Sequence, residues 1–240
     1  MDDARDEPWG GLEVVRLGDL PDDRPGGAAV VLLHGWGAPG DDLVGLAEVL
    51  ARPGVRFFVP AAPLDEVGGG RAWWHLDPED RPVHAWSEAS PPGYHPHPLV
   101  TGARRAVQGL LRTITLRHAP DTLLLGGFSQ GAMLALDVAL AADPPVDRVA
   151  ALSSVLLADS LPALKTPRAR RPPVLVTHGR QDPVLDFAGG ERAAALLTAN
   201  GFEVTWLPFD GGHEIPPPVL RGLEAFFFGG PGGRARSEDR

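Results

Sequence analysis

The segment G-G-F-S-Q-G-A at 126–132 places a serine between two glycines. It follows the apolar run at 123–125 and precedes a helical pattern, so Ser129 is predicted to lie on a sharp strand-to-helix turn that exposes its hydroxyl. Gly127 and Gly131 allow neighbouring backbone to approach such a turn without a Cβ clash. A serine in this setting is suited to nucleophilic attack on an acyl carbon, because the N-terminus of the following helix can stabilise an oxyanion.

Glycine-rich turns after strands also bind phosphates, and the same residues test that alternative. A dinucleotide fingerprint counted from Gly126 needs glycine where Phe128 stands. A nucleoside-triphosphate loop needs Lys and then Ser or Thr after Gly131, where Ala132 and Met133 follow. The sequence therefore excludes both phosphate sites, and an ordinary tight turn stays open as the alternative.

A serine nucleophile needs a base and a carboxylate that orients the base. After Ser129 the chain contains two histidines, His178 and His213. His213 lies in the glycine-rich segment D-G-G-H-E-I, and a loop residue is freer to reach the serine than His178 at the end of a strand. We therefore expect His213 to be the base.

The acid is predicted to be Asp182, in the loop that follows the strand ending near His178. Asp186 is the main alternative, although it more simply begins the next helix as its cap. Asp210 lies only three residues from His213 and is too local to orient it. The chain order Ser129, Asp182, His213 matches the order Ser, Asp, His of α/β hydrolases.

The segment L-H-G-W-G at 33–37 provides a candidate for the other half of an oxyanion hole. It ends an early apolar run with a glycine-rich turn, whose backbone N–H groups can point at a negatively charged oxygen. The N–H groups of Trp36 and Gln130 are the predicted donors. The side chain of His34 is expected to be structural.

Periodicity predicts the elements that position these residues. Strands are expected at 30–33, 55–59, 122–125, 148–152, 173–177 and 202–207, and helices at 41–52, 99–117, 132–142, 187–199 and 217–228. This alternation favours an α/β fold with a mainly parallel, doubly wound sheet and helices on both faces. Ligands of such sheets bind beyond the carboxyl ends of the strands, where the candidate residues stand.

One domain is predicted over 12–228, preceded by a loose acidic leader at 1–11 and followed by a disordered tail at 229–240. Within the domain, 61–98 is a long segment rich in proline, tryptophan and histidine. A loop of this length in a compact domain is usually functional, so we interpret it as a lid or substrate wall. His75, His84, His95 and His97 in this segment lack the spacing of a metal site, and no metal or other cofactor is predicted.

Composition excludes several classes of protein. With 22 Lys and Arg against 31 Asp and Glu, the net charge is −9, which argues against a nucleic-acid partner. The absence of cysteine excludes disulfides and thiolate zinc sites. No apolar run approaches the length of a transmembrane segment, and the acidic start is not a signal peptide, so a cytoplasmic location is expected.

These motifs together resemble the carboxylesterase/phospholipase family of the α/β-hydrolase superfamily, which includes acyl-protein thioesterases and bacterial carboxylesterases. The similar segments are L-H-G-W-G-A-P-G-D-D-L, R-A-W-W-H-L, G-G-F-S-Q-G-A, H-G-R-Q-D-P-V and G-G-H-E-I, in family order. The resemblance implies Ser129 as nucleophile, Asp182 as acid and His213 as base, with the oxyanion hole at Trp36 and Gln130. It also implies that Trp73 and Trp74 line an acyl-binding cleft.

The expected function is hydrolysis of carboxylic esters of short to medium acyl chains by a serine triad, through an acyl-enzyme. A thioesterase, a lysophospholipase or an acyltransferase with the same triad is the alternative, and a non-catalytic binding protein on this fold is a further one. The expected partner is a small-molecule ester or thioester. The chain is expected to be a monomer or a homodimer.

Overall fold

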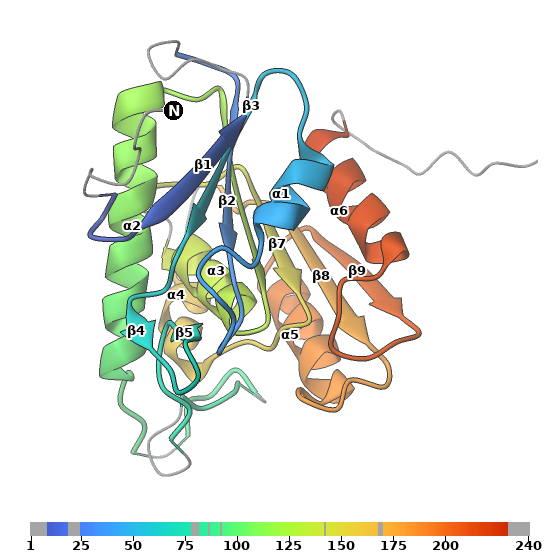
Figure 1. Ribbon diagram of the computed structural model, residues 1–240. Coiled ribbons are helices and arrows are strands. Elements are labelled where there is room, and N and C mark those ends of the chain that lie inside the picture. Colours follow the sequence, from blue (N-terminus) through green and yellow to red (C-terminus); the bar gives the residue numbers. More distant parts are fainter. Residues whose placement is uncertain are drawn as a thin grey trace, which may run out of the picture.

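The computed structural model describes residues 9–18, 25–77, 82–85, 87–91, 93–141, 143–167 and 170–229. Its centre is a seven-stranded sheet with the order β1-β3-β2-β6-β7-β8-β9 (Figure 1). The strands are β1 Val14–Gly18, β2 Ala28–Leu33, β3 Val55–Pro60, β6 Thr122–Phe128, β7 Arg148–Leu152, β8 Val174–Gly179 and β9 Val204–Phe209. All neighbouring pairs are parallel except β1 with β3, which are antiparallel. The predicted α/β fold with a mainly parallel sheet is confirmed.

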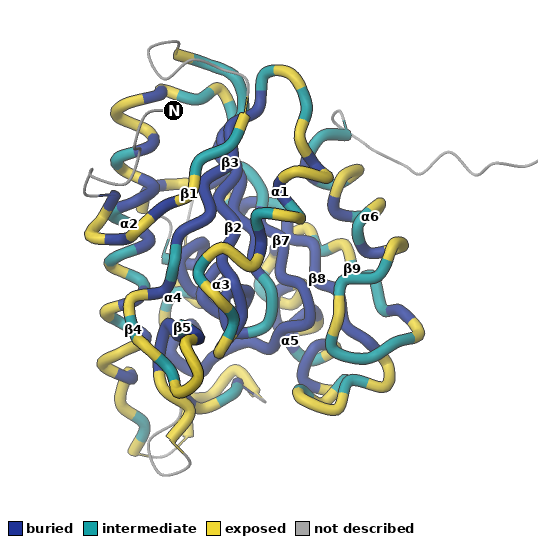
Figure 2. Tube along the Cα trace, in the orientation of Figure 1, coloured by how far each residue is buried: buried dark blue, intermediate teal, exposed yellow. Residues whose placement is uncertain are grey.

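Helices cover both faces of this sheet, and each face has its own apolar core. On one face lie α2 Pro98–His118, α3 Gln130–Ala141, η1 Ala158–Ser160, α4 Leu161–Lys165 and α5 Phe187–Ala199. On the other lie α1 Val44–Leu50 and α6 Pro217–Phe228. Figure 2 shows that the central strands and α3 are buried along most of their length, whereas the outer faces of α1, α2 and α6 are exposed. Burial on both sides explains why the central strands are continuous apolar runs.

Several boundaries differ from the expected ones for local reasons. Helix α1 begins at Val44 rather than residue 41, because Pro39, Gly40 and the two residues after them form turns before it. It ends at Leu50, before Arg52, which precedes Pro53 and is therefore disfavoured in a helix. Strand β1 was not predicted, since an edge strand with one buried residue, Val14, carries little apolar signal. The pair β4 Leu64–Asp65 and β5 Arg71–Ala72 lies inside the predicted irregular segment.

The ends of the chain fall partly outside the described residues. These include 1–8 of the predicted leader and 230–240 of the predicted tail. Trp9, the first described residue, is 2% exposed and packs against Phe58 and His118, with ring centroids 5.6 and 5.9 Å away. The packed region therefore includes residues that were expected to be loose. No helix within the described ranges is long and apolar enough to cross a membrane.

Candidate active site

The turn between β6 and α3 holds Ser129 in a backbone conformation that residues other than glycine rarely adopt. Its φ is 54°, and its N–H donates to the Leu152 carbonyl at the end of β7 at 2.9 Å. Such a conformation costs about 1–3 kcal/mol and persists only where the surrounding structure imposes it. The expected strand-to-helix turn is thus present, and it presents Ser129 at the carboxyl edge of the sheet.

The two glycines of the motif are required by close backbone packing. A Cβ on Gly127 would lie 2.4 Å from the carbonyl of Gly131. A Cβ on Gly131 would lie 2.1 Å from the Leu33 carbonyl oxygen, at the end of β2. This approach brings the first turn of α3 against the turn that follows β2, so both predicted oxyanion segments lie side by side.

His213 contacts Asp182 across two loops, the first after β8 and the second between β9 and α6. The distance from His213 Nδ1 to Asp182 Oδ2 is 2.7 Å, and the carboxylate is fully buried. Its other oxygen, Oδ1, accepts the backbone N–H groups of Val184 and Leu185 at 2.8 and 2.9 Å. Burial acts to raise the pKa of Asp182, but these three hydrogen bonds outweigh it and hold that pKa below its usual range. Asp182 is therefore an ionised partner for His213.

The alternative acids have other contacts. Asp186 is the N-cap of α5, and its side chain accepts the Ala188 N–H at 3.0 Å. The side chain of Asp210 is 88% exposed and lies 3.5 Å from the guanidinium of Arg180. Of the three acids considered from the sequence, the structure brings Asp182 to His213.

Ser129 and His213 line a common cavity of about 490 Å³. Its walls include the apolar side chains of Trp74, Met133 and Leu185. This volume lies within the range of small-molecule sites, which are usually apolar with a few polar groups. The arrangement can place an apolar acyl group in a cavity that Ser129 and His213 share, with Asp182 in contact with His213.

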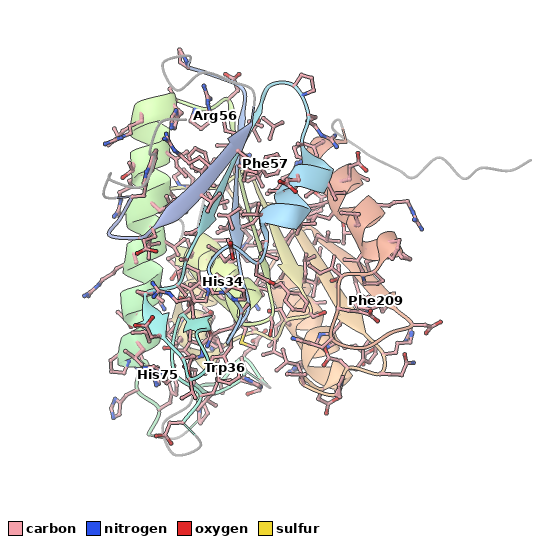
Figure 3. The ribbon with its side chains drawn as sticks, viewed as in Figure 1. His34, Trp36, Arg56, Phe57, His75 and Phe209 are labelled. Atoms are coloured by element: carbon pink, nitrogen blue, oxygen red, sulfur yellow. The ribbon has the colours of Figure 1, made fainter. Side chains whose placement is uncertain are left out.

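The turn after β2 lines the same cavity through Trp36, which is 46% exposed. Figure 3 shows Trp36 below His34 in that view. Backbone bonds brace this turn, since the Gly37 N–H donates to Arg71 O and the Arg71 N–H to Ala38 O, each at 2.9 Å. The N–H of Gln130 belongs to the first turn of α3, where backbone donors lack partners within the helix. The segments that carry the two predicted donors thus line the same cavity as Ser129.

His34 is a buried structural residue, as expected. Its Nε2 accepts the Ala62 N–H at 3.0 Å, so its Nδ1 carries the proton that is donated to Gly35 O at 2.8 Å. Burial lowers the pKa of His34, which keeps the ring neutral. The ring ties the turn after β2 to the residues after β3.

The side chain of Gln130 has contacts that the sequence did not suggest. Its Oε1 accepts the Trp73 N–H at 2.9 Å, and its Nε2 donates to Trp74 O at 2.8 Å. The two adjacent tryptophans have different surroundings. Trp74 lines the cavity, whereas Trp73 is 1% exposed and its indole N–H donates to His34 O at 3.0 Å. A single glutamine therefore fastens the tryptophan pair to the serine turn.

Parts of the segment 61–98 form one wall of the cavity, through Leu76, Pro82 and His84. Backbone bonds tie it to the residues after β7, with Ala85 N–H donating to Leu156 O at 2.7 Å and Ala158 N–H to Val83 O at 2.8 Å. Residues 78–81, 86 and 92 of this segment lie outside the described residues. Its motion as a lid stays a prediction.

The histidines of this segment have different contacts and different exposure to solvent. His75 Nδ1 lies 2.7 Å from Glu66, His95 is exposed and His97 is buried. The part of the chain that the structure describes contains no group of three or more His, Cys, Asp or Glu arranged to hold a metal ion.

Comparison with known proteins relates the whole arrangement to esterases. A sequence model of the phospholipase/carboxylesterase family matches residues 99–227. Acyl-protein thioesterase 1 of Neurospora crassa is 25% identical over 83% of this chain and 85% of that protein. Acyl-protein thioesterase 1 of Gibberella zeae is 35% identical over 45% of this chain, a match that spans 47% of that protein.

Solved structures extend this likeness over nearly the full chain. The crystal structure of esterase PE8 superposes with a TM-score of 0.73 and 30% identity, over 90% of this chain and 97% of that one. Acyl-protein thioesterase 2 of Zea mays superposes with a TM-score of 0.68 and 25% identity, over the same shares of the two chains.

Proposed function

Because the chain belongs to the phospholipase/carboxylesterase family of α/β hydrolases, we propose that it hydrolyses carboxylic esters of short to medium acyl chains through a triad of Ser129, His213 and Asp182. The observation that carries this proposal is the 2.7 Å contact between His213 and the buried Asp182, on a cavity that the strained Ser129 also lines. A strained serine and a histidine that line one apolar cavity, with a buried carboxylate in contact with the histidine, are the components of acyl transfer.

In the proposed reaction, Ser129 Oγ attacks the acyl carbonyl while Nε2 of His213 removes its proton. Asp182 accepts a hydrogen bond from Nδ1–H of His213 and stabilises the positive ring that forms when Nε2 takes up the serine proton. The carbonyl oxygen becomes an oxyanion and accepts hydrogen bonds from the N–H groups of Trp36 and Gln130. The N-terminus of α3 also stabilises its negative charge. The protonated histidine then gives its proton to the departing alcohol.

Water completes the cycle. His213 removes a proton from water, which attacks the acyl-Ser129 carbonyl, and the acid is released as Ser129 regains its proton. Each step uses side chains and backbone groups of this chain, and we propose no metal or cofactor for it.

Thioester hydrolysis is the second candidate, favoured by the relatives of Neurospora crassa and Gibberella zeae that are named acyl-protein thioesterases. Lysophospholipase or acyltransferase activity would use the same residues with a different leaving group or acceptor. A cytoplasmic location stays a prediction, and the oligomeric state, monomer or homodimer, stays open.

The test is labelling with a fluorophosphonate probe, combined with turnover of p-nitrophenyl esters of increasing acyl length. Ser129→Ala should abolish labelling and lower kcat by roughly three to six orders of magnitude. Ser87→Ala, in an exposed loop, is the matched control and should label like wild type. A folded wild type that neither labels nor turns over any ester or thioester would refute the proposal.

A further inference from the structure

His178 has no part in the reaction proposed above, yet its imidazole is completely buried at the carboxyl end of β8. A buried polar ring costs free energy unless its nitrogen atoms have hydrogen-bonding partners. From the sequence, His178 is the less suited of two candidate bases, and in the structure it does not line the cavity that Ser129 and His213 share. Its contacts lead instead to Asp182.

One ring nitrogen of His178 faces two oxygen atoms of the acid loop. Its Nε2 lies 3.0 Å from Leu185 O and 3.3 Å from Asp182 Oδ2. The latter oxygen is the one that His213 contacts at 2.7 Å, so two histidines meet on a single carboxylate oxygen. Nε2 faces two acceptor oxygens, the nearer at 3.0 Å, whereas Nδ1 faces one, Ser154 O, at 3.2 Å, so in the neutral ring we assign the proton to Nε2.

The opposite nitrogen, Nδ1, lies 3.2 Å from Ser154 O, in the segment after β7. Packing fixes the ring between these partners. A Cβ on Gly190 of α5 would lie 2.4 Å from Nδ1, and the ring of Phe187 stands edge-on at 6.0 Å. His178 therefore has one position, in which its Nε2–H points at the acid loop.

Leu185 closes a cycle of contacts, of which its own two are hydrogen bonds. Its N–H donates to Asp182 Oδ1, and its carbonyl oxygen accepts the hydrogen bond from Nε2–H of His178. Oδ1 is thus held by the loop's own backbone, whereas Oδ2 is approached by two histidines. Leu185 also lines the cavity, so this cycle joins the acid to the wall of the substrate site.

We propose that His178 is a positioning residue of the triad, whose Nε2–H fixes the Asp182 carboxylate and the Leu185 carbonyl so that Oδ2 meets Nδ1 of His213. This rests on the proposed function. Without this donor, the carboxylate can turn away from His213, and small displacements in an active site cost up to about 100-fold in rate. The loss falls mainly on kcat, because His178 does not line the cavity itself and Leu185, which does, keeps its N–H bond to Asp182 Oδ1.

The test compares two buried replacements with a p-nitrophenyl ester as substrate. His178→Leu keeps apolar bulk but removes the donor, and should lower kcat by about 10- to 100-fold with KM changed by less than about threefold. His178→Gln keeps an amide N–H near the position of Nε2 and should recover most of that loss. The pH profile of kcat/KM is a second readout. Its acid limb should shift in the leucine variant and regain its wild-type position in the glutamine variant, because proton transfer on that limb depends on the contact between His213 and the charged Asp182.

A folded His178→Leu with wild-type kcat and pH profile would overturn the inference. Equal losses in both variants would overturn it too, because they would show that His178 acts only by filling space in the core. The triad itself is checked separately, because Asp182→Asn should lose activity whatever His178 does. If the leucine variant does not fold, ¹⁵N NMR of the wild-type histidines decides the question. An unprotonated Nε2 of His178 overturns the inference, and a protonated Nε2 supports it.

Discussion

Replacement of Gln130 by leucine tests whether its side chain holds the tryptophan segment against the serine turn. The change keeps the size of the side chain and removes two buried hydrogen bonds, to Trp73 N–H and Trp74 O. Each of these backbone groups would then lack its partner in an environment where both tryptophans are 1% exposed.

The expected cost follows from these two groups. A buried polar group left without a partner costs about 1–3 kcal/mol, so the variant should lose about 2–6 kcal/mol of its free energy of unfolding. For a domain of this size, each kcal/mol lowers Tm by about 2–4 °C, which gives a decrease on the order of 5–20 °C. The backbone N–H of Gln130 is retained, so KM should rise more than kcat falls as the Trp74 wall loosens.

Urea unfolding, thermal melting and ester kinetics measure these effects. Gln108→Leu, on α2 and away from the cavity, is the matched control and should change stability by less than about 0.5 kcal/mol. A Gln130→Leu variant as stable as this control, with an unchanged KM, would show that the tryptophan segment is held by packing alone and would refute the reasoning.

Two further changes test buried carboxylates. Asp182→Asn should lower kcat by about 10⁴-fold. Because the pKa of Asp182 is lowered in the folded state, its ionisation stabilises the fold above its ordinary pKa, and this contribution is lost as pH falls below about 4. The difference in unfolding free energy between wild type and Asp182→Asn should therefore shrink in that range, and a constant difference would contradict the assignment. Arg104→Met removes the charged partner of Asp137, which is 1% exposed and keeps the Ser160 hydroxyl as a side-chain donor, and should cost about 3–5 kcal/mol in urea unfolding. Arg105→Met, at the exposed neighbour, should change stability little. Burial raises the pKa of Asp137, so the deficit should grow as pH rises, and a deficit independent of pH would argue against an uncompensated charge.

The parts of the site that depend on local patterns could be predicted from the sequence. Ser129 follows a buried apolar run, and glycines flank it, so both the strand and the sharp turn are indicated within a few residues. The rule that parallel strands end at a common edge then brings the loops of Asp182 and His213 together. The helical cap formed by Asp186 is likewise a local signal.

Other features depend on contacts between distant residues and have no local signal. Gln130 bonds to residues 56 and 57 positions away, and the sequence gives no reason to choose a side-chain partner for it. Trp73 and Trp74 are adjacent and chemically alike, and only the tertiary fold decides that Trp74 lines the cavity while Trp73 bonds to His34. Nothing in the sequence around His178 distinguishes it from another residue at a strand end, because its environment is formed by the packing of α5.

The segments around the cavity are anchored in two different ways, and this difference bears on how the site can vary. The serine turn depends on backbone packing, since even a Cβ on Gly131 would collide with Leu33. The wall formed by Trp74 depends on the side chain of Gln130, and His97 further along is held through its N–H by the Asp159 carboxylate at 2.7 Å. Residues that lie between these side-chain anchors can change while the anchors stay in place, whereas the backbone contacts at Gly127 and Gly131 leave no room for a side chain. Changes within 74–97 can therefore reshape the cavity wall while Ser129 keeps its position, which makes this segment the place where acyl preference can change without loss of the catalytic geometry.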